Sequence, residues 1–168
     1  MRFFAAAAVI VLGAGAASAE CLRVAAPHEV RCLPMRGGSF QLSWIHSVER
    51  TEWRETYRVD SGQVILTASE FSSAGAGLPD CLLPGEVFHN RSGRMWIDHR
   101  HIPIRDLRIR LSPLSHHVLH VDGRDLDLTA LFGESVVSIG VQREGTPDET
   151  APGSARRRAL LRVVGPRG

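Results

Sequence analysis

The strongest constraint on the fold is an alternation of apolar and polar residues that continues on both sides of a short polar segment. From Phe40 to Val48 the even-numbered positions are apolar except for His46, and the odd-numbered positions are mostly polar. The alternation resumes from Trp53 to Val59, where Glu55 is the charged exception on the apolar face. A period of two is typical of a half-buried β-strand. The segment therefore predicts a β-hairpin whose buried face carries a histidine and a carboxylate.

The tightest register of this hairpin places those two groups opposite each other. A turn over residues 49–52 keeps both apolar faces on the same side of the pair of strands. Because a buried charge is costly unless it is paired, the sequence predicts a His46–Glu55 contact. Two interpretations stay open: the contact fixes strand register, or it lines a pocket that binds a polar ligand. The expected pairs are Val48 with Trp53, His46 with Glu55, and Trp44 with Tyr57.

The rest of the chain has the rhythm of an all-β protein. Short apolar blocks alternate with turn-forming clusters such as Asp60-Ser61-Gly62 and Asp122-Gly123. No sustained helical period occurs after residue 19. We expect one all-β domain, a β-sandwich or a partly open barrel of short antiparallel strands, over residues 20–143. The expected strands are 22–25, 29–33, 40–48, 53–60, 64–71, 94–99, 107–111, 118–121, 125–128 and 135–143.

The two ends of the chain differ from this domain. Residues 1–19 combine Arg2, an apolar run and Ala17-Ser18-Ala19, which predicts a secretory signal peptide cleaved before Glu20 and a periplasmic protein. A retained membrane anchor is the alternative, but the apolar run is shorter than the roughly 20 residues that a spanning helix needs. Residues 144–168 predict a flexible linker and a basic tail. The tail is either an edge strand or a membrane contact.

Charge and cysteine content narrow the chemistry. The formal net charge of the full chain is only +2, so the sequence does not predict a nucleic-acid-binding protein. Export would permit disulfides. Cys21 and Cys32 flank two short strands and are the expected pair, although three cysteines allow three pairings and Cys81 is left over.

A second candidate site is the small-residue segment from Phe71 to Pro79. Gly75 and Gly77 can adopt positive φ, so a run of backbone N–H groups there can form a nest for a carboxylate or a phosphate. The segment lacks the lysine of a phosphate-binding loop. The alternative is a tight crossover between sheets that needs small residues for packing.

The sequence contains no recognisable catalytic or metal-binding motif. Ser47 follows His46 directly, so on a strand the two side chains face opposite sides and cannot form a nucleophile–base pair. His99 and His101 would share one face of a strand, but neither they nor the later cluster at 116–120 has a third ligand in view. We expect no metal and no cofactor. A small secreted hydrolase or metal-dependent enzyme that uses His46 and Glu55 is the alternative.

Three motifs together resemble a known family. They are Ile45-His-Ser-Val-Glu49, then Glu55 with Tyr57, then Gly75-Ala-Gly-Leu-Pro79. In this order and spacing they resemble the bacterial domain-of-unknown-function family 1850 over residues 22–141. The resemblance implies a small exported or membrane-anchored protein whose gene often lies beside permeases of TRAP transporters that use TAXI-type solute receptors. It implies no reaction, ligand or catalytic residue.

The expected function is therefore that of a periplasmic accessory or ligand-binding protein of such a transport system. Its partner would be the TRAP permease or the solute receptor, and its ligand a small carboxylate; the tail would supply any membrane contact. A purely structural domain, in which the motifs serve folding, is a further alternative. The candidate site residues are His46, Ser47, Glu49, Glu55, Tyr57, Gly75, Gly77 and Pro79.

Overall fold

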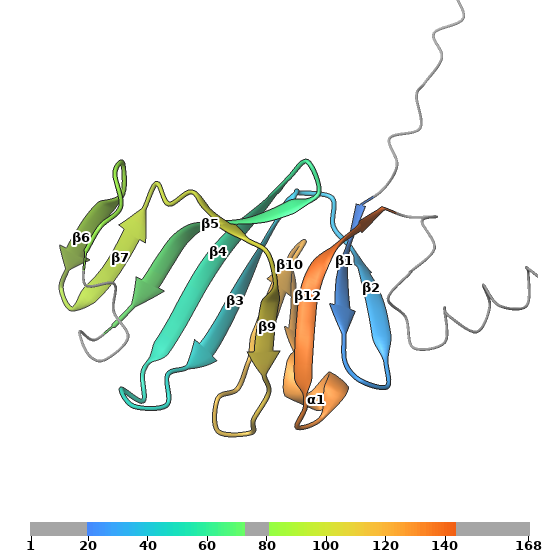
Figure 1. Cartoon of the computed structure of the whole chain (residues 1–168). Coiled ribbons are helices and arrows are strands. Elements are labelled where there is room, and N and C mark those ends of the chain that lie inside the picture. The colour runs from blue at the N-terminus through green and yellow to red at the C-terminus, as the bar shows by residue number, and fades with distance from the viewer. Residues whose placement is uncertain (1–19, 73–80, 144–168) are drawn as a thin grey trace, which may run out of the picture.

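Antiparallel strands are the main elements of the structure, which is a computed structural model that describes residues 20–72 and 81–143. They build two separate sheets, shown in Figure 1. The four-stranded sheet, here sheet A, has the order β2-β1-β12-β9. Its strands are β1 (Glu20–Ala25), β2 (Val30–Pro34), β9 (Leu107–Arg110) and β12 (Val136–Arg143).

The larger sheet, here sheet B, has the order β11-β10-β3-β4-β5-β7-β6, and β8 also pairs with β5. Its strands are β3 (Ser39–Ile45), β4 (Glu52–Asp60), β5 (Gln63–Phe71), β6 (Val87–Arg91), β7 (Arg94–Asp98), β8 (Ile102–Ile104), β10 (Val118–Val121) and β11 (Arg124–Asp127). One helix, α1 (Leu128–Phe132), follows β11. The predicted all-β fold is confirmed, and it is the sandwich rather than a closed barrel.

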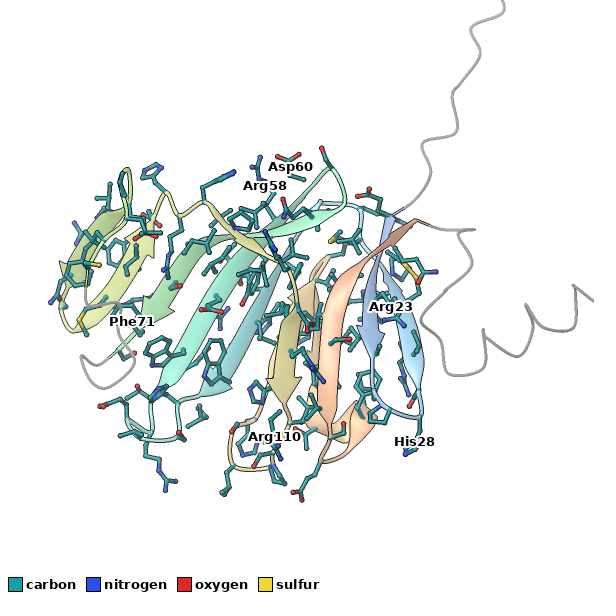
Figure 2. The ribbon with its side chains drawn as sticks, viewed as in Figure 1. Arg23, His28, Arg58, Asp60, Phe71 and Arg110 are labelled. Carbon is teal, nitrogen blue, oxygen red and sulfur yellow. A yellow bond between two sulfur atoms is a disulfide. The ribbon has the colours of Figure 1, made fainter. Side chains whose placement is uncertain are left out.

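The main core lies between the two sheets. Alternate residues of sheet A, such as Leu22 and Val137, are fully buried against alternate residues of sheet B, such as Leu119 and Tyr57. A second buried cluster consists of Trp53, Phe71, Met95 and Ile97, which all belong to sheet B. Figure 2 places Phe71 and Arg23 at opposite ends of the body. One end of sheet B therefore has an apolar face that sheet A does not pack against.

A β-bulge in β5 sets which side chains reach this inner face. Tyr57 pairs with Leu66 and Glu55 pairs with Ser69, so Thr67 is the extra residue. The insertion lets Leu66 and Ser69 both point inward, although a regular strand would put them on opposite faces. The Thr67 carbonyl accepts a hydrogen bond from the backbone N–H of Arg100 at 3.0 Å. The bulge thus anchors the segment that carries Arg100.

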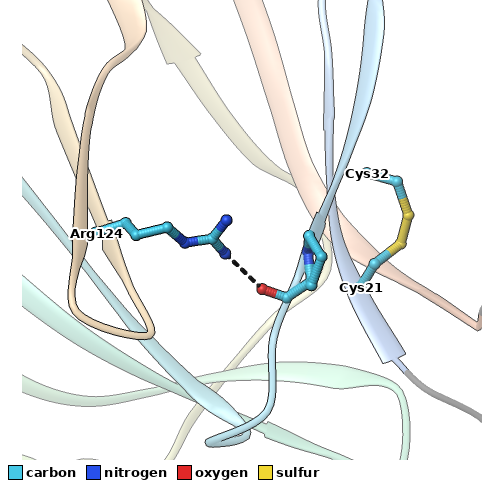
Figure 3. Close-up of a disulfide and its surroundings, with 4 residues drawn as sticks. Cys21, Cys32 and Arg124 are labelled. Carbon is cyan, nitrogen blue, oxygen red and sulfur yellow. Dashed lines mark hydrogen bonds between the residues drawn. A yellow bond between two sulfur atoms is a disulfide. The ribbon is translucent and has the colours of Figure 1, made fainter.

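The disulfide confirms the predicted Cys21–Cys32 pair, which Figure 3 shows. The two Cα atoms are 5.5 Å apart across β1 and β2, and Cys81 is exposed with a free thiol. On the other side of β2, Arg124 Nη2 donates a hydrogen bond to the Pro34 carbonyl at 3.0 Å. The disulfide closes the first hairpin, and the Arg124 hydrogen bond fastens that hairpin to β11.

The expected strands agree with the structure at ten places and miss two. The strands β6 and β8 and the one-turn helix α1 are not among the elements that the sequence predicts. The predicted signal peptide (1–19), the small-residue site at Gly75, Gly77 and Pro79, and the predicted linker and tail (144–168) lie outside the described residues. Within the described ranges, no helix has the length and apolar character needed to span a bilayer.

Candidate functional site

The predicted register of the central hairpin is wrong. In the structure Trp44 lies opposite Trp53, and Glu55 lies opposite Leu42. Strand β3 ends at Ile45, so His46 belongs to the turn and does not face Glu55 across the hairpin. The turn is longer than the tightest one because the hydrogen bonds from His46 N to Thr51 O and from Arg50 N to His46 O close it at 2.9 Å each.

The turn gives its candidate residues different surroundings. The His46 ring stacks on Trp53 with ring centroids 4.9 Å apart, and its Nδ1 accepts the Glu49 backbone N–H at 3.4 Å. Ser47 is exposed. Val48 was expected to point inward, but it is 66% exposed at the tip. His46 therefore covers the end of the buried aromatic cluster, while the tip faces water.

Glu55 has a different partner from the predicted one. The Tyr57 hydroxyl, which is almost fully buried, donates a hydrogen bond to Glu55 Oε2. Ser69 lies directly opposite Glu55 on β5 and accepts a hydrogen bond from Arg100 Nη1 at 2.6 Å. The inner face of sheet B thus carries a polar cluster made of Glu55, Tyr57, Ser69 and Arg100.

Glu86 extends this cluster. Arg100 Nε donates to Glu86 Oε1 at 2.9 Å, and the Leu83 backbone N–H donates to Glu86 Oε2 at 2.9 Å. Only 10% of the Arg100 side chain and 2% of the Glu86 side chain are exposed. Immediate neighbours therefore shield the Glu86 carboxylate from water.

Burial and charge shift the pKa values of these groups in opposite directions. Burial raises the pKa of Glu55, and the Tyr57 hydrogen bond and the Arg100 charge offset only part of that rise. Burial and the neighbouring Glu55 also raise the pKa of Tyr57. Burial favours a higher pKa for Glu86 as well, but its hydrogen bonds from Leu83 and Arg100 outweigh it and lower the value. Arg100 therefore interacts more strongly with Glu86 than with Glu55.

An aromatic row lies beside the polar cluster. Trp53 is stacked between His46 and Phe71, and Trp44 contacts both Trp53 and His117 at centroid distances of 6.0 and 6.2 Å. Trp53 is 7% exposed and His117 is 8% exposed. Burial lowers the pKa of His117, which favours its neutral form.

Two polar atoms of this row have no hydrogen-bond partner among the described residues. They are Trp53 Nε1 and His117 Nδ1. A buried donor or acceptor without a partner costs about 1 to 3 kcal/mol, and buried polar groups in native proteins are rarely left so. The row therefore offers two unused hydrogen-bonding positions on either side of the Trp44 ring.

The histidine clusters give no site of the expected geometry. Strand β7 ends at Asp98, and His99 has a positive φ of 58°, so His99 and His101 do not share a strand face as predicted. Both side chains are exposed. Over residues 20–72 and 81–143, no group of three or more His, Cys, Asp or Glu side chains is arranged to hold a metal ion.

A family comparison places this site in a wider context. Residues 40–128 match the family described as Domain of unknown function (DUF1850). The chain belongs to the DUF1850 family. The match is narrower than the resemblance over residues 22–141 suggested. Searches for similar curated proteins and for similar solved structures found no match.

The DUF1850 segment contains the whole of the candidate site. The five residues of the polar cluster, Glu55, Tyr57, Ser69, Glu86 and Arg100, lie within it, as do those of the aromatic row. Three strands of sheet A, namely β1, β2 and β12, lie outside the matched residues. The matched part of this DUF1850 protein therefore supplies the sheet that carries the site, and the flanking strands cover its other end.

Several residues of the site were not predicted from the sequence. Glu86 and Arg100 lie outside the expected strands, Ser69 lies in the expected strand 64–71 without being singled out, and His117 was noted only as a member of a histidine cluster. Arg100 reaches the site because the bulge at Thr67 binds its backbone. A charged residue whose partner lies elsewhere in the chain gives no local signal.

The raised pKa of Glu55 predicts a particular pH dependence of stability. The folded state holds the Glu55 proton more tightly than the unfolded chain does, so the free energy of unfolding should fall as pH rises from about 4.5 through the raised folded pKa. Glu55→Gln removes this loss and keeps an oxygen for the Tyr57 hydroxyl. Urea unfolding at a series of pH values should show the variant more stable than the wild type above this interval.

The control for this experiment is Glu52→Gln. Glu52 is an exposed glutamate on the same strand, paired with Arg54 at the surface, so its replacement should change stability by at most about 1 kcal/mol. If Glu55→Gln is less stable than the wild type at neutral pH, attraction to Arg100 outweighs burial and the proposed cause of the pKa rise is wrong.

Proposed function

We propose that this DUF1850 protein is a periplasmic accessory or ligand-binding protein of a TRAP solute transport system that uses a TAXI-type receptor. Its contact or ligand site is the aromatic row and polar cluster on the inner face of sheet B. The partner is the permease or the solute receptor, and the ligand class is a small carboxylate. The genomic association implied by the family resemblance supports the choice of system.

One observation supports a binding role more than any other. Trp53 Nε1 and His117 Nδ1 are buried and have no partner among the described residues. A ligand or partner group that bonds to them recovers the cost of leaving them unpaired. Aromatic side chains with a few polar positions are the usual composition of a small-molecule site.

The chemistry of the row favours a group with an acidic or carbonyl oxygen next to an apolar body. Trp53 Nε1–H can only donate, so it requires an acceptor such as a carboxylate oxygen. Neutral His117 can present Nδ1 as donor or acceptor, and the Trp44 ring between them offers an apolar face.

The hydrolase that uses His46 and Glu55 gains no support from this geometry. Its two groups do not face each other across the hairpin, and the Glu55 carboxylate accepts the Tyr57 hydroxyl instead. A purely structural role remains the competing hypothesis, and the following experiment separates it from binding.

Trp53→Phe tests the binding site directly. The substitution keeps an aromatic ring and removes the unpaired Nε1–H, so the protein should stay folded while binding weakens by about tenfold or more. The measurement is native mass spectrometry of the protein isolated gently from cells that contain the transport system. The wild type should carry an added small-molecule mass or capture the permease or receptor, and Trp53→Phe should lose it.

Trp96→Phe is the matched control. Its Nε1 donates to Asp98 Oδ2 at 2.9 Å and its ring stacks on His89, so it lies outside the aromatic row. This variant should keep the added mass or the captured protein. A folded Trp53→Phe protein that retains them equally, or a wild type that carries nothing and captures neither transporter component, contradicts the proposal.

A further inference from the structure

Three side chains on the outer face of sheet B are joined by two successive hydrogen bonds. Ser43 Oγ lies 2.9 Å from His120 Nε2, and His120 Nδ1 lies 2.7 Å from Asp125 Oδ1. With its hydrogen on Nδ1, the imidazole donates to the carboxylate and leaves Nε2 to accept the serine hydroxyl proton. This is the order of contacts in a Ser-His-Asp catalytic triad.

The topology of sheet B creates this arrangement from distant parts of the chain. Strand β10 lies between β3 and β11, with Ser43 opposite Val118 and His120 opposite both Gln41 and Asp125. His120 therefore reaches Asp125 straight across one strand pair and Ser43 diagonally across the other. The outer face carries these groups, while their neighbours Leu42, Leu119 and Val121 point into the core.

We propose that Ser43, His120 and Asp125 form a second functional site that hydrolyses esters with a short acyl group. This site lies on the opposite face of the sheet from the aromatic row, so it is independent of the binding function proposed above. Ser43 acts as nucleophile, His120 as general base and then general acid, and Asp125 as the group that orients the imidazole.

The reaction follows from the contacts. Ser43 Oγ attacks the ester carbonyl carbon as its proton passes to His120 Nε2; the tetrahedral oxyanion then collapses, and the leaving alcohol takes that proton. Water attacks the acyl-serine, gives a proton to His120, and the second collapse releases the carboxylic acid and restores Ser43. Asp125 accepts the hydrogen bond from His120 Nδ1 throughout and takes part in no bond change. One ester and one water give one acid and one alcohol.

Arg54 is placed to stabilise the oxyanion. It lies directly opposite Ser43 on β4, where side chains of a cross-strand pair are neighbours. Backbone N–H groups cannot take this role, because β3 lies inside the sheet and uses its N–H groups in hydrogen bonds to β4 and β10. The guanidinium already contacts Glu52 and Gln41 through Nη2 and Nη1, which fixes its position.

The surroundings of Ser43 limit the substrate. A hollow of about 470 Å³ lies beside the triad and is lined in part by Gln41, Arg54, Thr56, His120 and Asp125. Ser43 itself is only 6% exposed, so a bulky acyl group cannot approach Oγ. Polar walls and a guanidinium favour an acetyl-sized acyl group on a polar alcohol.

The test uses p-nitrophenyl acetate and a fluorophosphonate whose phosphorus carries only short alkyl substituents, matched to the small acyl group, on the purified full chain. The wild type should release p-nitrophenol catalytically, and intact mass spectrometry with peptide mapping should find one phosphonyl group on Ser43. Asp125→Asn, at a side chain 74% exposed and so compatible with folding, should lower the hydrolysis rate roughly 100-fold. Ser43→Ala should abolish both hydrolysis and labelling.

Ser138→Ala is the matched control, since Ser138 is a strand serine of sheet A opposite Ala25 and Arg108. This variant should hydrolyse and label like the wild type. The proposal is overturned if the folded wild type neither reacts with the fluorophosphonate at Ser43 nor hydrolyses the ester. It is also overturned if Asp125→Asn retains the wild-type rate. Neither result bears on binding at the aromatic row.

Discussion

Arg100→Ala is expected to lower the free energy of unfolding by about 3 kcal/mol, the lower end of what removing one partner from a buried ion pair costs. The variant leaves the Glu86 carboxylate, whose side chain is 2% exposed, without its charged partner, and Ser69 without its donor. We take the lower end because the hydrogen bond from the Leu83 backbone N–H to Glu86 remains in the variant. Urea unfolding followed by tryptophan fluorescence measures the loss.

The pH dependence of the same variant identifies the cause. Because the folded pKa of Glu86 is lowered from 4.5, its stabilising contribution is present above that pH and is lost as pH falls through the folded value. The difference between wild type and Arg100→Ala should therefore narrow in acid. Arg94→Ala is the control: it removes an ion pair to Glu70 from an arginine side chain that is 67% exposed, so about 1 kcal/mol or less should be lost. If Arg100→Ala and Arg94→Ala lose the same free energy of unfolding, the interpretation of Arg100 and Glu86 as a buried ion pair is wrong.

Removing the disulfide should lower the free energy of unfolding nearly as much as Arg100→Ala does. Cys21 and Cys32 are eleven residues apart, and a loop of this size contributes about 2 to 3 kcal/mol on the chain-entropy account. A Cys21→Ser, Cys32→Ser double variant should lose this amount in urea unfolding, and dithiothreitol should lower the wild-type stability to the same level. The disulfide matters most for β2, which is the edge strand of sheet A and pairs there only with β1.

Cys81→Ser provides the comparison, since the Cys81 thiol is exposed and free. This variant should unfold like the wild type and respond to dithiothreitol in the same way. A double variant of Cys21 and Cys32 that unfolds like the wild type would show that sheet pairing alone holds the first hairpin.

The fold class was predictable because alternation is a local signal. The face that each residue of β3 and β4 presents was predicted correctly, with Leu42 and Tyr57 buried. The register was not, because alternation leaves several registers with the same parity, and turn geometry chooses among them. The structure chooses the longer turn, which stacks His46 on Trp53 and pairs Trp53 with Trp44.

The strands and the helix that the sequence does not predict have only weak patterns of apolar and polar residues. Strand β6 is mostly exposed on both faces, with Val87 and Phe88 over 40% exposed, so it has no alternation to detect. Helix α1 is a single turn capped by Asp127, which accepts the Ala130 N–H at 2.9 Å. One turn is too short to establish a helical period.

The polar sites depend on contacts that no local pattern contains. Ser43 and His120 meet because β10 inserts beside β3, although many residues separate them in sequence. Arg100 and Glu86 meet through a loop held by a bulge. Motif analysis selected His46 and Glu55 as partners, whereas the fold assigns each of them a different one.

The pairing of the first described strand with the last has a consequence for how this protein acquires its structure. Glu20 lies opposite Arg143, and β1 contacts β12 along its whole length. Sheet A therefore cannot be completed until β12 is available, and β1, joined to β2, stays unpaired on that side until then. Such a high separation between contacting residues predicts slow folding, in milliseconds to seconds, and a need for protection of the exposed core during synthesis.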